Sequence, residues 1–214
     1  MHPSHMIKSK NGSRWAVRFA SGTVSALALL ALERDAHALP LLTLWGSVRG
    51  LYGSVAGDAA TVGWSSATGT QYQNVNGYGP GLGLSAGVTL PLSLYIGASF
   101  DYFFGETVSF NAGPDVSRGS SQLLARVGYD LGLGPLTLRP ELGLGALFSN
   151  VKVEGGPPET PQHEISANGT VLAPALEAFF GLGTLNLNAE ARYELVAGNN
   201  SNALVLGLGL GVSL

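Results

Sequence analysis

The last eleven residues of the chain alternate between large apolar side chains and small ones. Leucine or valine occupies every second position: Leu204, Leu206, Leu208, Leu210, Val212 and Leu214. The intervening positions are Val205, Gly207, Gly209, Gly211 and Ser213. Because successive side chains of a β-strand point to opposite faces, this pattern predicts a strand with one apolar face and one face of mostly small residues.

The same two-residue period recurs in seven further segments, which predicts an all-β fold of eight strands. We place the strands at about residues 42–54, 81–90, 92–103, 120–131, 136–147, 170–180, 185–196 and 204–214. Strands of this length match the ~9–11 residues of a tilted membrane strand and exceed the ~5–6 of an ordinary globular strand. After residue 38 no segment is apolar for 18 consecutive residues, so helices that span a membrane are not expected.

The connections between these strands alternate between short and long. Tight turns rich in Gly and Pro are expected at Leu90-Pro91, at 131–135 and at 181–184. Long polar segments at about 55–79, 104–119 and 148–169, and a shorter one at 198–202, separate them. Short turns at one end and long loops at the other are typical of an up-and-down outer-membrane barrel.

Two kinds of eight-stranded barrel fit this pattern, and side-chain size decides between them. A soluble lipocalin-like barrel keeps its apolar residues inside, whereas a membrane barrel turns them outward. Eight strands leave an interior just wide enough for side chains, so rows of leucine from every strand would overfill it. The same rows exposed to water would exceed any apolar patch that soluble monomers tolerate. We therefore expect leucine to face lipid, with glycine, serine and charged residues in the lumen.

On this alternating pattern, residues 39–214 resemble the small eight-stranded outer-membrane barrels of Gram-negative bacteria, the OmpA/OmpX-like group. The resemblance implies an antiparallel transmembrane β-barrel located in the bacterial outer membrane. It also implies contact with outer-membrane lipid and lipopolysaccharide, and with the barrel-assembly machinery.

The first 38 residues are typical of a secretory signal peptide with a possible upstream extension. Four basic residues and no acid precede an apolar run over 19–32, and Ala36-His37-Ala38 matches a cleavage site. This segment holds five of the 11 basic residues and two of the 14 acidic ones, which leaves 39–214 with a net charge of −6. Nucleic acid is therefore not an expected partner.

Charged residues fall on the face that we assign to the lumen. They form an expected interior network of Arg49, Asp101, Arg126, Asp130, Arg139, Glu141, Glu177, Glu190, Arg192 and Glu194. Buried charges must be paired. A turn centred on Leu133-Gly134 would place Asp130 opposite Thr137 and Arg126 opposite Glu141, which predicts an ion pair between the latter two. Arg139 and Glu177 are a second expected contact.

Two prolines fall within the predicted strands, on the face assigned to lipid. Proline cannot donate a ladder hydrogen bond, and a closed barrel has no free edge to accommodate it. We therefore expect β-bulges or displaced strand ends at Pro140 and Pro174.

The loops hold the remaining information on function. Trp64, Tyr72 and Tyr78 lie among amides and small residues in the first long loop, and we predict that they contact an extracellular ligand, still unknown. No cofactor, metal site or catalytic residue is expected, since the lone loop His163 has no partner set of ligands and cysteine is absent. We predict a structural or adhesin-like role; a narrow transport pore is the alternative, and a lipid-modifying enzyme is less favoured.

Overall fold

The computed structural model describes residues 42–57, 61–66, 69–74, 76–110, 113–154, 163–197 and 201–214. The predicted signal peptide over 1–38 lies outside these residues. In the described part of the chain, no helix has the length and apolar character needed to cross a membrane.

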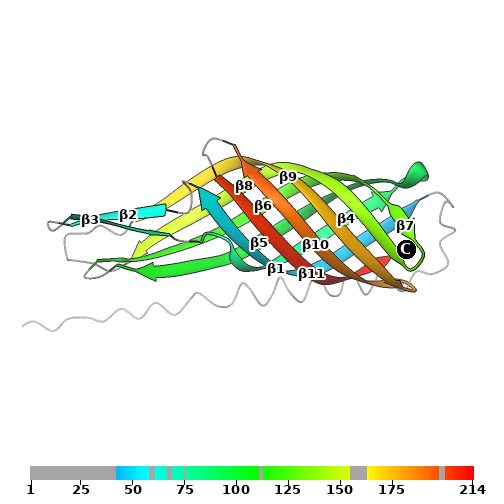
Figure 1. The fold of residues 1–214 in the computed structure, drawn as a ribbon, viewed down its shortest axis with the longest axis horizontal. Coiled ribbons are helices and arrows are strands. Elements are labelled where there is room, and N and C mark those ends of the chain that lie inside the picture. The colour runs from blue at the N-terminus through cyan, green and yellow to red at the C-terminus, as the bar shows by residue number, and fades with distance from the viewer. Residues whose placement is uncertain are drawn as a thin grey trace, which may run out of the picture. The chain divides into compact units, whose positions relative to one another are not determined.

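Eight antiparallel strands close into a barrel within the described residues (Figure 1). Seven of them are β1 (Thr43–Gly57), β4 (Gly79–Thr89), β5 (Leu94–Ser109), β8 (Leu136–Glu154), β9 (His163–Leu182), β10 (Leu185–Val196) and β11 (Ser201–Ser213). The eighth is β6 (Asp115–Tyr129), which continues past Asp130 as the short β7 (Leu131–Leu133). Pairing of β6 with β8 and of β1 with β11 closes the ring.

Tight connections occur at the end of the barrel where sequence predicted them. Leu133 pairs with Leu136 and Leu182 pairs with Leu185, so each of these hairpins has a two-residue loop. The loops begin with Gly134 and Gly183, whose positive φ angles of 73° and 78° suit glycine. A 3₁₀ turn, η2 (Pro91–Ser93), joins β4 to β5.

The strands continue further toward the long loops than the apolar pattern predicts. β5 ends at Ser109 and β6 begins at Asp115, while β8 reaches Glu154 and β9 begins at His163. The segment assigned to the first loop also contains a hairpin of β2 (Thr61–Ser66) and β3 (Gly69–Asn74) at the loop end of the barrel (Figure 1). Backbone pairing does not require an apolar face, so strands that leave the lipid zone lose the alternation without losing their hydrogen bonds.

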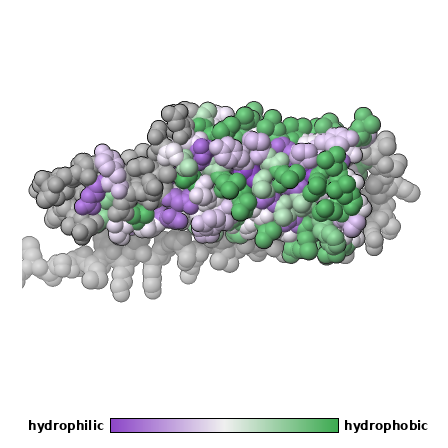
Figure 2. All heavy atoms as spheres, in the orientation of Figure 1, coloured by the Kyte–Doolittle hydropathy of each residue, from purple (hydrophilic) through white to green (hydrophobic). Residues whose placement is uncertain are grey.

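The outer wall carries the leucine rows, as the pattern predicted. Leu204, Leu206, Leu208 and Leu210 on β11 are 50–71% exposed, whereas Val205 between them is fully buried. Figure 2 shows apolar side chains over the barrel wall toward the turn end, with more polar ones toward the loop end.

The prolines interrupt single ladders and cause no bulge. Pairing of β8 with β9 continues in one register through Pro140 and Pro174. On its other side Pro174 faces a gap in the ladder between Arg192–Ala175 and Leu195–Leu172, and the register is the same on both sides of that gap. Pro140 likewise stands where the pairing of β6 with β8 ends. The expectation of bulges or displaced strand ends is wrong for both prolines, since β8 and β9 run through them without a break. Each strand residue donates to only one neighbouring strand, so a proline disturbs a single ladder.

Within the described parts of the barrel strands, the one shift in register lies between Phe103 and Glu106, where β5 pairs with β6. Gly105 has a φ of 70°, and an added Cβ there would overlap the carbonyl oxygen of Arg118. The freed Gly105 N–H donates to the carbonyl of Tyr78 at 3.0 Å. The bulge therefore ties the first loop to the rim of the barrel.

Candidate functional site

Nine of the ten charged residues predicted for the lumen are buried inside the barrel, and Asp130 is half-buried. We call eight of them the charge layer: Arg49, Asp101, Arg126, Glu141, Glu177, Glu190, Arg192 and Glu194. They come from six different strands, β1, β5, β6, β8, β9 and β10. All eight occupy inward-facing positions of the two-residue period, so the alternation places each of them in the lumen.

Each arginine of the charge layer contacts several carboxylates. Arg192 lies 2.7 Å from Asp101, 3.0 Å from Glu190 and 2.7 Å from Glu194. Arg126 reaches Glu190 at 3.1 Å, and Arg49 also contacts Glu190. Glu190 therefore joins three guanidinium groups, which makes it the centre of the network.

The expected Arg126–Glu141 ion pair is present, although the register predicted for it is wrong. Arg126 Nε lies 2.6 Å from Glu141 Oε2. Their strands are shifted by two residues from the prediction, so that Arg126 pairs with Gly143. The turn is centred between Gly134 and Pro135, one residue later than assumed. The long side chains still meet on a diagonal.

Arg139 and Glu177 are direct cross-strand partners in the register, yet their side chains bind elsewhere. Arg139 donates to Asp130 from Nε at 2.5 Å and from Nη2 at 3.0 Å. Glu177 lies 3.3 Å from Arg126 and 3.8 Å from Arg49. The expected second contact is therefore replaced by an Arg139–Asp130 pair at the turn end.

An aromatic cage encloses Arg139, and sequence reasoning missed it. The guanidinium carbon lies 3.7 Å from the ring centroid of Tyr95, 4.4 Å from Phe179 and 4.7 Å from Trp45. Cation–π contacts of this kind stabilise a desolvated arginine. All three aromatic residues occupy inward positions of their strands, so the alternation in the sequence could have placed them in the lumen with Arg139.

Glycines on the inward face make room for the charge layer. An added Cβ at Gly209 would lie 2.7 Å from Arg49 Cγ and 2.6 Å from Asn188 Oδ1. At Gly83 it would lie 2.5 Å from Asp101 Oδ1. These distances are too short for real Cβ contacts, so the large charged groups fit only beside glycine.

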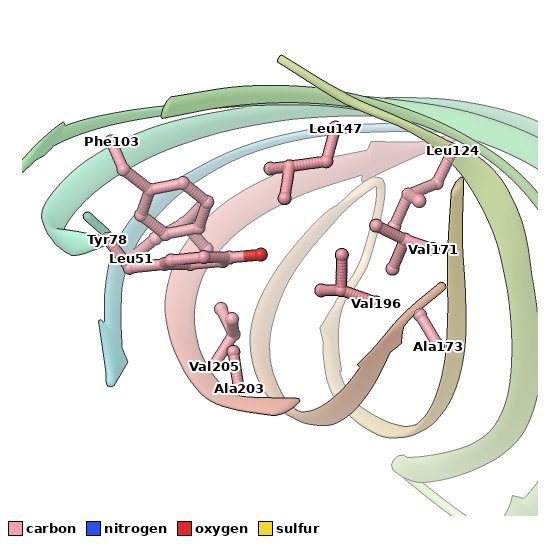
Figure 3. Packing of buried hydrophobic residues seen from close by; sticks show 10 residues of the cluster. All are labelled: Leu51, Tyr78, Phe103, Leu124, Leu147, Val171, Ala173, Val196, Ala203 and Val205. Atoms are coloured by element: carbon pink, nitrogen blue, oxygen red, sulfur yellow. The ribbon is translucent and has the colours of Figure 1, made fainter. Parts of the chain in front are cut away.

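A second group of buried residues fills the lumen on the loop side of the charge layer. We call it the apolar layer (Figure 3): Leu51, Tyr78, Phe103, Leu124, Leu147, Val171, Ala173, Val196, Ala203 and Val205. Along β1 the order toward the loops is Arg49 then Leu51, and along β5 it is Asp101 then Phe103. The predicted alternation gives the inward side of eight of these residues, whereas Tyr78 was assigned to a loop and Ala203 lies outside the predicted strands. The gathering of all ten into one layer was not predicted.

Tyr78 lies inside the barrel, so its assignment as a loop contact is wrong. Its side chain is 3% exposed, its ring centroid lies 4.7 Å from that of Phe103, and its hydroxyl donates to Glu194 at 2.7 Å. Asn76 donates to the Gly53 carbonyl at 2.9 Å and Ser120 to the Gly77 carbonyl at 2.6 Å. These bonds fold the end of the first loop into the barrel mouth.

The other two predicted contact residues belong to the hairpin beyond the barrel. Tyr72 on β3 is 71% exposed, and Trp64 lies on β2, with its side chain outside the described part. Among the described residues, no three His, Asp or Glu side chains are grouped so as to hold a metal.

Comparison with solved structures identifies the same architecture in other proteins. A major outer membrane protein from Thermus thermophilus superposes with a TM-score of 0.57 at 14% identity, over 80% of this chain and 99% of that one. The fold is that of a small outer-membrane barrel. Ail, the attachment invasion locus protein of Yersinia pestis, gives 0.54 in its complex with the heparin analogue sucrose octasulfate, at 15% identity over 81% and 99% of the chains.

Neisserial surface protein A is a third structure of this kind, with a TM-score of 0.51 and 16% identity over 79% of this chain and 96% of that one. No protein-family model matches the chain, and no curated protein matches it. At these identities the comparisons show the fold alone, so the role of the chain has to be argued from its own residues.

Proposed function

We propose that this chain is an outer-membrane barrel whose filled lumen serves as a scaffold and whose loop end binds an extracellular partner. The leucine rows support insertion in lipid, since 34 large apolar side chains are exposed on the described surface. Export to the outer membrane, contact with lipopolysaccharide and insertion by the barrel-assembly machinery are part of the proposal.

The observation that carries a surface role is the contrast between the filled interior and the projecting hairpin. Two layers of buried side chains fill the lumen, whereas β2 and β3 pair only with each other and present Tyr72 to solvent. Exposed tyrosine is a residue that binding surfaces favour. The structural neighbour from Yersinia pestis is named for attachment and invasion, which agrees in kind with this role.

The experiment is an adhesion assay on a Gram-negative host that displays the full chain. Cells are applied to surfaces coated with fibronectin, laminin or heparin, and a host with an empty vector gives the background. We expect adhesion above background on at least one protein-coated surface. Binding to heparin is not expected, because residues 39–214 carry a net charge of −6.

A double variant tests whether the β2–β3 hairpin is the part of the chain that mediates adhesion. Trp64→Ala combined with Tyr72→Ala is expected to reduce adhesion about tenfold or more, the effect of losing binding hot spots. Tyr193→Ala, which removes an exposed tyrosine from the barrel wall, is the matched control and should leave adhesion unchanged. Adhesion no greater than background, or equal loss in both variants, would overturn the proposal.

A further inference from the structure

A groove on the outer wall of the barrel lies at the edge of the apolar surface that is nearer to the loops. It has a volume of about 290 Å³ and follows the outward faces of β5, β6 and β8. Its lining combines the rings of Tyr102, Phe104 and Phe148 with polar side chains that include Ser117, Ser121, Asn150 and Lys152. This volume is near the lower end of the ~300–1,000 Å³ typical of small-molecule sites.

Gly119 opens the middle of this groove. It faces outward between Ser117 and Ser121 and pairs with Asn150 across the ladder. An added Cβ would meet its nearest atom, the Phe103 carbonyl oxygen, at 3.4 Å, which is ordinary contact. The backbone therefore permits a side chain at this position, and that side chain would extend into the groove.

The groove joins two chemically different zones of the wall. On its turn side lie Phe100, Leu123 and Leu144, which are 45–57% exposed and belong to the apolar surface. On its loop side, Asp115 and Glu154 are exposed cross-strand partners. The rim between such zones is where the headgroups of the outer leaflet lie around an outer-membrane barrel.

We propose that this groove binds the phosphorylated sugar headgroup of a glycolipid, with the acyl chains against the apolar wall on the turn side of the groove. The rings would pack on the sugar, the Ser121 hydroxyl would bond its hydroxyl groups, and Lys152 would pair with a phosphate. Asp115 and Glu154 lie on the loop side, and Glu164 pairs with Lys152 across the ladder, so the phosphate would reach Lys152 from the turn side of the groove. The inference rests on the proposed membrane location and not on the hairpin's role.

The test measures lipid binding to the refolded full chain in non-ionic detergent, by native mass spectrometry. The probes are a bis-phosphorylated glucosamine disaccharide lipid, its dephosphorylated form, and phosphatidylglycerol. The phosphorylated glycolipid is expected to bind about tenfold more tightly than phosphatidylglycerol, a difference of about 1.4 kcal/mol. Equal affinity for the two, or tighter binding of phosphatidylglycerol, would overturn the proposal.

Variants then locate the binding. Gly119→Leu fills the groove and should weaken glycolipid binding tenfold or more, whereas Gly50→Leu, at an outward glycine of β1 with its nearest neighbour 3.9 Å away, should not. Lys152→Gln should reduce the preference for the phosphorylated form about threefold to fivefold, as expected for an exposed ion pair. Glu154→Gln should strengthen binding. Wild-type affinity in Gly119→Leu would contradict the site.

Gel mobility before and after boiling monitors folding in each sample. If Gly119→Leu lacks the folded band, Ser121→Leu fills the same groove from a side chain that already faces outward and decides the matter by the same criterion. A wild-type chain without a folded band would count against the proposed membrane barrel itself. A folded band without groove-dependent binding overturns only the lipid site.

Discussion

The charge layer and the apolar layer fill the same lumen by opposite means. In the charge layer, each group depends on named partners on other strands, as Glu190 does on three arginines. In the apolar layer, side chains such as Leu124 and Val205 need only to fit together, and both are fully buried. The first layer depends on specific polar pairing, whereas the second, apart from the Tyr78 hydroxyl, depends only on apolar packing.

The difference shows why the two layers complement each other. A buried ion pair contributes little net stability, because desolvation offsets the attraction, but removing one partner is costly. We therefore expect the charge layer to specify which strands meet more than it stabilises the barrel. The apolar layer lies on the loop side of this polar network, together with the buried polar side chains of Gln122, Ser120 and Ser149, each of which is hydrogen-bonded.

The largest expected effect is the loss of the central carboxylate. Glu190→Gln removes the closest carboxylate of the buried Arg49, whose other carboxylates lie 3.5 and 3.8 Å away, and should lower the free energy of unfolding by about 3–5 kcal/mol. Urea unfolding in detergent micelles, followed by gel mobility, measures it. Glu106→Gln, at an exposed position of β5, is the control and should change the free energy by less than about 0.5 kcal/mol. Equal stability of the two variants would show that the charge layer is not dependent on pairing.

The second largest effect on stability is expected from a variant that creates a cavity in the apolar layer. Leu124→Ala should cost about 2–5 kcal/mol, because the closed lumen leaves the space empty. Leu123→Ala, at the neighbouring outward position, should cost less since lipid or detergent occupies the space. The same urea titration compares them. A larger cost at Leu123 than at Leu124 would reverse our assignment of the two faces.

The contact between the two layers should show the smallest of these effects. Tyr78→Phe keeps the ring in the apolar layer but removes its hydrogen bond to Glu194, with an expected cost of about 1.5–3 kcal/mol for a bond to a charged group. Tyr102→Phe on the exposed wall should cost nothing measurable. A neutral result at Tyr78 would mean that the two layers are energetically independent.

The sequence was enough to predict the features that depend only on whether a strand residue faces inward or outward. The two-residue alternation predicts that Arg49 and Val205 face the lumen and that Leu206 faces outward. It also predicts that the residues of the charge layer lie in the lumen. The Arg126–Glu141 contact was also predicted, because long side chains tolerate a shift of two residues in register.

What could not be predicted depends on exact register or on structure outside the lipid zone. The turn at Gly134 and Pro135 set a register that the pattern allowed in more than one way. The aromatic cage of Arg139 and the grouping of the apolar layer both required that register. Tyr78 has the composition of a loop around it, and only the bond to Glu194 and the backbone bonds near it reveal that it enters the barrel.

The central claim is that side chains close the lumen, so that the chain acts through its loop end and not as a channel. Conductance of the refolded full chain in a planar lipid bilayer tests this most directly, after gel mobility has shown that the barrel is folded. We predict a baseline without discrete steps in potassium chloride over a range of voltages. Steady, salt-dependent conductance steps from the folded protein would contradict the account and favour a narrow transport pore.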